Sequence, residues 1–191
     1  MVISNVKIED AKSLALLHKK VFGEIHFTTS FSISLLTKYF ENLISQMKYS
    51  IVMKENEEIL GYLFAGSNIE KIINNFLKIY FVQISFYLLR NPRFILEKVL
   101  EFTNSIKLKS KQADNEISLY LIAVNTRLGK RGLGKELMNH FEGMVRKNNE
   151  KSYNLSVRKN NQQAIDFYLK SNFIQIETNK KSIKFKKEFI S

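Results

Sequence analysis

Residues 119–141 read LYLIAVNTRLGKRGLGKELMNHF, and this stretch decides the fold class. Its first residues are apolar and β-prone, which predicts a strand over 117–124. Three of the seven glycines follow within six residues, at Gly129, Gly132 and Gly134. An amphipathic pattern then begins, which predicts a helix over 134–147. A strand, a glycine-rich loop and a helix are therefore expected in this order.

The glycine-rich loop has the features of an anion-binding site. Glycine permits positive φ and the close approach of a ligand to the backbone. The N-terminus of the following helix presents free N–H groups and the positive end of the helix dipole, which suits a pyrophosphate. Basic side chains surround the loop: Arg127, Lys130, Arg131 and Lys135. The glycine spacing fits neither a Walker loop nor a dinucleotide fingerprint, and a turn without a ligand is the alternative.

The stretch resembles the acetyl-CoA-binding motif of the GCN5-related N-acetyltransferase (GNAT) superfamily. That motif is Gln/Arg-x-x-Gly-x-Gly/Ala after a strand that ends in an apolar-Ala-Val triplet. Residues 122–124 match the end of the strand, and residues 132–134 match the glycine positions. Gly129 stands where Gln or Arg is usual. Because backbone amides do most of the pyrophosphate binding in the family, we expect binding to survive this change.

Residues 155–173, LSVRKNNQQAIDFYLKSNF, resemble a second motif of the same family. That motif is a strand, then Asn-x-x-Ala, then Tyr, then a Gly-Phe pair. The matching residues are Asn161, Ala164, Tyr168 and Phe173. Asn172 replaces the usual glycine, and a left-handed turn accepts Asn nearly as well. The two motifs occur in the family's order and spacing, and together they cover about residues 117–174.

The resemblance implies an enzyme that transfers the acetyl group of acetyl-CoA directly to a primary amine. Acetyl-CoA is then the co-substrate, and no metal is needed. In the family, the N–H of Ile122 would polarise the thioester carbonyl, Val124 would pair with the pantetheine, and the loop amides would hold the pyrophosphate. The implied cofactor-binding residues are Ile122, Ala123, Val124, Arg127, Gly129, Lys130, Arg131, Gly132, Leu133, Gly134, Lys135, Asn161, Ala164 and Tyr168.

The resemblance also supplies candidates for catalysis. Tyr168 occupies the family's general-acid position, where it would protonate the CoA sulfur; the alternative is a core aromatic residue. The family's base positions on the central strand hold Tyr120 and Ser118, and neither is a good base near neutral pH. Glu116 lies on their face by period-two alternation and is one candidate base, or else a solvated residue at the start of the strand. His26, in the loop between the first two helices, is the other candidate.

The order of the expected elements indicates an α/β (α+β) fold, a mixed and mostly antiparallel sheet flanked by helices. This is the acyl-CoA N-acyltransferase fold, and we expect one domain over residues 1–191. An apolar helical insertion over about 69–106 separates the third and fourth strands, and Pro92 is expected to divide it into two helices. The insertion has more large apolar residues than one buried helix stripe requires. We therefore expect the insertion to pack over the acceptor cleft, to form a homodimer or to lie on a membrane surface.

The remaining elements follow from periodicity and turn residues. Asp10 can cap a helix that Gly23 ends, and the closing hairpin turns near Asn179. The expected segments are a strand at 2–8, a helix around 35–44, a hairpin at 50–65, a strand at 153–157, a helix at 162–170 and a hairpin at 173–189.

The net charge is +12, from 30 Lys and Arg against 18 Asp and Glu. Residues 116–191 hold 15 of the basic and 7 of the acidic residues, so most of the excess lies beside the glycine-rich loop. The charge favours an anionic partner, although lysine-rich composition is an equal alternative. The absence of cysteine excludes a disulfide framework, a thiolate zinc site and a cysteine nucleophile. No targeting signal or spanning segment is recognised, so a cytoplasmic protein is expected.

These observations favour an N-acetyltransferase with a small-molecule amine acceptor, an amino sugar nucleotide being one example. An acetyltransferase for protein N-termini or lysine side chains is the alternative within the fold. A basic nucleic-acid-binding module and a non-catalytic acyl-CoA-sensing domain are alternatives of other classes. No nucleic-acid-binding motif is present, so no nucleic-acid partner is expected.

Overall fold

The computed structural model describes residues 1–191 apart from 24–25, 91–115, 127–128, 130 and 190–191. The chain divides into two compact units, which are described separately. The first unit comprises Met1–Val6, Met47–Ile69 and Asp114–Ser191, and the second comprises Lys7–Gln46 and Glu70–Ala113. The expectation of one domain over the whole chain stays a prediction.

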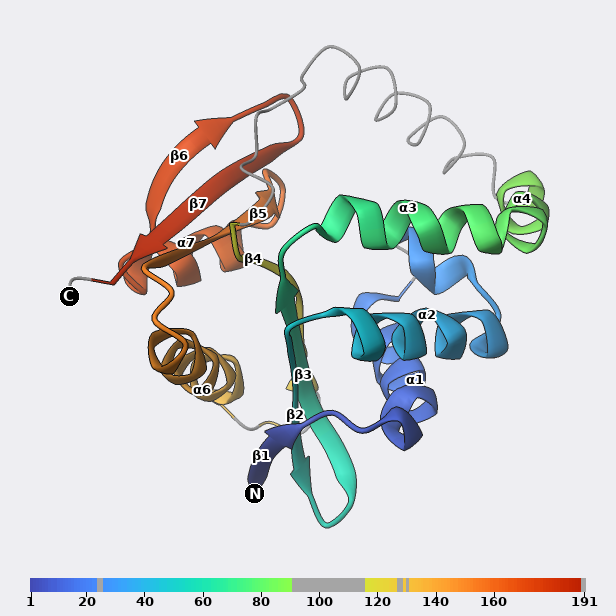
Figure 1. Ribbon diagram of the computed structural model, residues 1–191, viewed down its shortest axis with the longest axis horizontal. Helices are drawn as coiled ribbons and strands as arrows, with labels where there is room; N and C mark the ends of the chain where they lie inside the picture. Colours follow the sequence, from blue (N-terminus) through green and yellow to red (C-terminus); the bar gives the residue numbers. More distant parts are fainter. Residues whose placement is uncertain (24–25, 91–115, 127–128, 130, 190–191) are drawn as a thin grey trace. The chain divides into compact units, whose positions relative to one another are not determined.

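The first unit is built on a seven-stranded sheet with the order β1-β2-β3-β4-β5-β7-β6 (Figure 1). Its strands are β1 (Val2–Asn5), β2 (Tyr49–Glu55), β3 (Glu58–Gly66), β4 (Ser118–Val124), β5 (Ser152–Arg158), β6 (Ile174–Thr178) and β7 (Ser182–Glu188). Among the described strands, only β4 and β5 run parallel, whereas every other neighbouring pair is antiparallel. This confirms the mixed, mostly antiparallel sheet that the sequence predicts.

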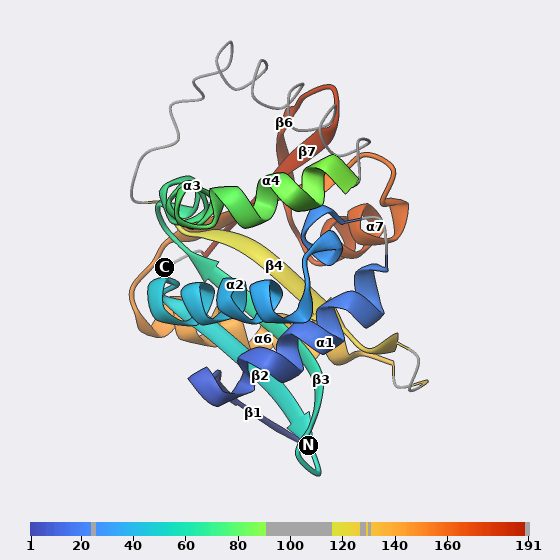
Figure 2. The same cartoon turned by 90° about the vertical axis from the view of Figure 1, so that its right-hand side faces the viewer.

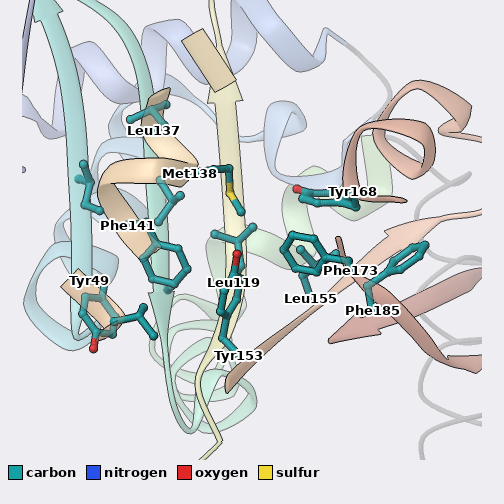
Figure 3. Packing of buried hydrophobic residues seen from close by; sticks show 14 of the residues in the cluster. Tyr49, Leu119, Leu137, Met138, Phe141, Tyr153, Leu155, Tyr168, Phe173 and Phe185 are labelled. Atoms are coloured by element: carbon teal, nitrogen blue, oxygen red, sulfur yellow. The ribbon is translucent and has the colours of Figure 1, made fainter. Parts of the chain in front are cut away.

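Two helices of the first unit, α6 (Leu133–Lys147) and α7 (Gln162–Lys170), pack on one face of the sheet. The core on this face is rich in aromatic residues. The rings of Phe141 and Tyr153 lie 4.9 Å apart, and those of Tyr168 and Phe173 lie 5.1 Å apart. Figure 3 shows these residues, with Met138 and Leu155, filling the space between the helices and the strands. Apolar residues at helical spacing therefore fix both helices against the strands that carry the site.

The second unit contains α1 (Ala11–Phe22), α2 (Ile33–Gln46), α3 (Ile69–Ile79) and α4 (Phe81–Arg90). Figure 2 shows α1 and α2 side by side. Helix α1 ends at Gly23, as expected, because this residue has a φ of +53°. Between α1 and α2 lies a short 3-10 helix, η2 (Phe27–Ser30), and another, η1 (Ile8–Asp10), precedes α1.

The insertion contains a helix break that the sequence pattern does not predict. The helix breaks at Tyr80, between α3 and α4, whereas Pro92 lies outside the described residues. Phe76 and Ile84 are buried on either side of this break. The break therefore coincides with tertiary packing on both sides, and there is no proline at this position. The apolar side chains of 76–89 are only partly buried within the described chain. The large exposed apolar side chains in α3 and α4 are Ile79, Phe81, Val82, Phe86 and Leu89.

Candidate active site

The centre of the site is the divergence of β4 from β5. Each strand has seven residues, yet they pair only at Ser118 with Asn154 and at Leu119 with Leu155. Beyond this step the two parallel strands are not paired with one another. The edge of β4 that faces β5 therefore has backbone groups with no ladder partner along most of its length.

A β-bulge in β4 lies at the start of the divergence. Leu119 pairs with Ala65 of β3 and Leu121 pairs with Phe64, so Tyr120 is the extra residue in the register between these two pairs. An extra residue of this kind bends the strand and increases its local twist. The bend is a physical reason for β4 to leave β5 after Leu119. It also interrupts the alternation of side chains along the strand.

The two faces of β4 follow from this bulge. Leu119 and Ile122 contact the core beneath α6, and Val124 approaches Gly61 on the same side. Ser118, Tyr120, Leu121 and Ala123 are therefore on the opposite face. Strict period-two alternation would place Ser118 and Val124 on one face, and it does not hold across the bulge.

The backbone of β4 alternates in its direction of hydrogen bonding. The N–H of Asn125 donates to the carbonyl of Leu60, at 2.7 Å, so the backbone groups of Asn125 and Ala123 face β3. By the same alternation, the N–H and C=O groups of Ile122 and Val124 face the side from which β5 has diverged. These two residues can therefore pair with an extended ligand as a neighbouring strand would.

The glycine-rich loop leads from β4 into α6. Gly132 caps the helix with a φ of +86°, and Gly129 has a φ of +67°, a region that favours glycine. Apart from the adjoining backbone and chain neighbours, no heavy atom of the described residues lies within 4 Å of a Cβ built on Gly129, Gly132 or Gly134, so a ligand has space to approach. The first hydrogen bond within α6 is from the N–H of Glu136 to the carbonyl of Gly132, at 3.0 Å.

The amides of the first turn of α6, at 133–135, therefore have no partner within the helix. Arg131 and Lys135 are exposed beside them, whereas Leu133 is buried and anchors the turn in the core. Arg127 and Lys130, which the sequence also assigns to this site, lie outside the described residues. Free amides, the helix dipole and two cations together form a site that suits a pyrophosphate.

Helix α7 begins and ends as its motif predicts. Asn161 caps it, because the Asn161 side-chain oxygen accepts a hydrogen bond from the N–H of Ala164 at 3.1 Å. After its last residue, Asn172 adopts a φ of +62° in the position where glycine is usual. Half-buried Ala164 and buried Ile165 direct the helix onto the core.

Tyr168 is 5% exposed and lies among the rings of Phe167, Phe173 and Phe185. Burial raises the pKa of the Tyr168 phenol, so the group stays protonated at neutral pH. Within the described part of the chain its hydroxyl makes no hydrogen bond, whereas the buried hydroxyl of Tyr153 donates to Glu142 at 2.7 Å. Tyr168 is thus packed as a core residue, and its hydroxyl proton is not donated to any described protein group.

The two candidate bases lie in different units. Glu116, just before β4, has an oxygen 3.9 Å from the ammonium of Lys186, which contacts Glu188 more closely at 2.9 Å. His26 belongs to the second unit, where its Nδ1 lies 2.7 Å from the Thr28 hydroxyl. The nearby His18 is fully buried and contacts the same hydroxyl at 2.7 Å, and desolvation lowers the pKa of His18 to about 3.

Two buried amides in the first unit were not anticipated from the sequence. Asn125, at the end of β4, and Asn154, at the pairing step with Ser118, are each 1% exposed. Within the described residues, neither polar side-chain atom of Asn125 has a hydrogen-bond partner, and the Nδ2 atom of Asn154 has none. Asparagine inside a β-prone run such as SYNLSV is the signal that could have found Asn154, because this residue type is depleted in strands.

The comparisons with known proteins agree with this geometry. Residues 17–173 match the family model described as the acetyltransferase (GNAT) family. The chain belongs to this family, and it is an acetyl-CoA-dependent acetyltransferase. No curated protein matches the chain.

Several solved structures share the fold. PH1933 from Pyrococcus horikoshii OT3 has a TM-score of 0.66 at 12% identity, over 100% of this chain and 99% of that one. The paiA N-acetyltransferase of Thermoplasma acidophilum, in complex with coenzyme A, has a TM-score of 0.60 at 14% identity, over 98% of each chain. A ribosomal-protein-alanine N-acetyltransferase from Brucella melitensis has a TM-score of 0.64 at 10% identity, over 99% of this chain and 100% of that one.

The described residues contain neither a candidate membrane span nor a candidate metal-binding cluster. None of their helices has the length and apolar character needed to cross a membrane. In the same part of the chain, no group of three or more His, Asp or Glu side chains could hold a metal ion.

Proposed function

We propose that this protein transfers the acetyl group of acetyl-CoA directly to the primary amine of a small-molecule acceptor. The divergence of β4 from β5, with the backbone groups of Ile122 and Val124 directed into it, is the observation that carries the proposal. Acetyl-CoA supplies an acetyl group activated as a thioester. The basic surplus of residues 116–191 supports an acceptor with an anionic group.

Each element of the motif region has a proposed role in binding. Val124 pairs with the pantetheine amides, and the N–H of Ile122 donates to the thioester oxygen, where negative charge develops during transfer. The amides of 129–134 hold the pyrophosphate, assisted by the basic side chains of this loop, and Asn161 contacts the pantetheine. The binding set is Ile122, Ala123, Val124, Arg127, Gly129, Lys130, Arg131, Gly132, Leu133, Gly134, Lys135, Asn161, Ala164 and Tyr168.

The proposed chemistry needs one proton donor and one proton acceptor. The amine nitrogen bonds to the carbonyl carbon, the carbon–sulfur bond breaks, and Tyr168 gives its proton to the departing thiolate. Burial raises the pKa of Tyr168, so its phenol is protonated at neutral pH and has a proton to give. The acceptor of the amine proton is Glu116, directly or through a water, or His26.

A screen of amines with a thiol-release assay tests the proposal. We expect acetyl-CoA to raise the melting temperature and at least one small primary amine to release CoA. Acetylation of peptides alone would move the function to protein N-termini or lysine side chains. No thermal shift with any acyl-CoA would contradict the proposal as a whole.

A further inference from the structure

The pair Ser118 and Asn154 lies at the last paired step before β4 and β5 diverge. The Ser118 hydroxyl donates to the Oδ1 atom of Asn154, at 2.8 Å. Leu119 and Leu155, the next pair, belong to the core on the α6 side, so the polar pair is on the opposite face. A polar side-chain pair therefore lies next to the point where β4 and β5 diverge.

The Nδ2 group of Asn154 is a donor without an acceptor. It is buried with no hydrogen-bond partner among the residues that the structure describes, and the backbone N–H of Asn154 donates to the carbonyl of Ile117 at 3.0 Å. A buried amide donor without a partner costs about 1–3 kcal/mol, so it requires an explanation. Since Oδ1 already accepts from Ser118, an added partner must offer an acceptor atom, and an ammonium group offers none.

The approach to this amide is from the face opposite α6. On the α6 side, Leu119 and Leu155 are enclosed by the core (Figure 3). On the face of Asn154, the next β5 residue, Ser156, is exposed. Lys186 is opposite Asn154 in the β5–β7 ladder, and its flexible side chain can move to admit a ligand.

We propose that the Asn154 amide donates a hydrogen bond to an oxygen atom of the acceptor. The acceptors are then amines with a hydroxyl, carbonyl or carboxylate oxygen near the amino group. Polyamines, whose protonated nitrogens are donors only, are disfavoured. This inference rests on the proposed function and specifies its acceptor, because it makes Asn154 a residue that determines acceptor specificity.

The test compares two amines of equal size, 2-aminoethanol and propylamine, with acetyl-CoA. We expect wild type to prefer 2-aminoethanol, and Asn154→Leu to reduce the ratio of the two kcat/KM values by about tenfold. Asn125→Leu is the matched control, because it removes an unpartnered buried amide at the other end of β4. Its ratio should equal that of wild type. An unchanged ratio in Asn154→Leu would overturn the inference.

A second measurement does not depend on turnover. In NMR spectra of the CoA-loaded protein, the side-chain amide signals of Asn154 are identified by comparison with Asn154→Leu, in which these signals are absent. They should shift on titration with 2-aminoethanol and stay in place with propylamine. No shift with 2-aminoethanol would mean that this amine does not reach the amide. The inference would then fail, even where acetyl-CoA binds and amines are acetylated. A missing thermal shift with acetyl-CoA would instead contradict the proposed function.

Discussion

The motif region, from β4 to α7 (Ser118–Lys170), and the insertion, helices α3 and α4, are both rich in apolar residues but use them differently. In α7, Ile165 and Tyr168 are buried in a core shared with the sheet. In α4, Ile84 is buried, whereas Phe81 and Phe86 are 68% and 52% exposed. Apolar composition alone therefore does not tell which helix is held by a core. Side-chain spacing combined with loop and cap residues identifies the motif region.

The largest effect we expect concerns the anchoring of the insertion. Phe76 is 1% exposed and contacts Tyr39 and Tyr80, with ring centroids 5.3 and 4.7 Å away. Phe76→Ala should lower the free energy of unfolding by about 3–5 kcal/mol, because it opens a cavity. Phe86→Ala, at an exposed site, should change it by less than about 0.5 kcal/mol. Urea denaturation measures both, and equal losses would mean that α4 is held as firmly as α3.

The next effect concerns ligand binding at the glycine-rich loop. Gly132→Val places a β-branched residue at a φ of +86° and puts a side chain in the space where amides are free. Acetyl-CoA affinity, measured by calorimetry, should fall by about 2–3 kcal/mol, roughly 30- to 140-fold. Gly143→Ala, on the exposed side of α6, should add up to about 1 kcal/mol of stability with no change in affinity. Equal binding by Gly132→Val and wild type would remove the loop from the site.

Tyr168 and Tyr153 provide a comparison within one core. Tyr168→Phe should lower kcat by about 100-fold, because the general acid is lost, with acetyl-CoA affinity changed less than about twofold. Tyr153→Phe removes the hydrogen bond to Glu142 and should cost about 1 kcal/mol of stability, with kcat unchanged. Rapid-mixing kinetics and thermal unfolding distinguish the two effects. A Tyr168→Phe enzyme with normal kcat would reduce Tyr168 to a packing residue.

The smallest effect concerns His18 in the second unit. Its folded-state pKa is lowered from 6.5 to about 3 by desolvation and by the nearby His26. The unfolded chain therefore binds a proton that the folded chain excludes, and stability falls as the pH decreases from about 6.5 toward 3. Between pH 7 and pH 5 this group should cost roughly 2 kcal/mol. Denaturation of His18→Gln should show a smaller loss over this range, and identical pH profiles would contradict the assignment.

The sequence predicts more of the motif region than of the insertion, for physical reasons. The glycines, the Asn161 cap and the left-handed Asn172 are local requirements of the backbone, so they are readable from residue type. The bulge at Tyr120 has no glycine or proline to signal it, and it arises from pairing with β3, a contact distant in sequence. The break at Tyr80 and the exposure of Phe86 likewise depend on tertiary packing, which apolar periodicity does not specify.

The central claim is that acetyl-CoA occupies the divergence of β4 from β5. Amide hydrogen exchange, followed by NMR with and without acetyl-CoA, tests it residue by residue. Without ligand, the amides of Ile122 and Val124 should exchange much faster than those of Ala123 and Asn125, which face β3. Acetyl-CoA should slow exchange at Ile122 and Val124 and at the first-turn amides of α6. Unchanged exchange at Ile122 and Val124 in protein saturated with acetyl-CoA would contradict the account.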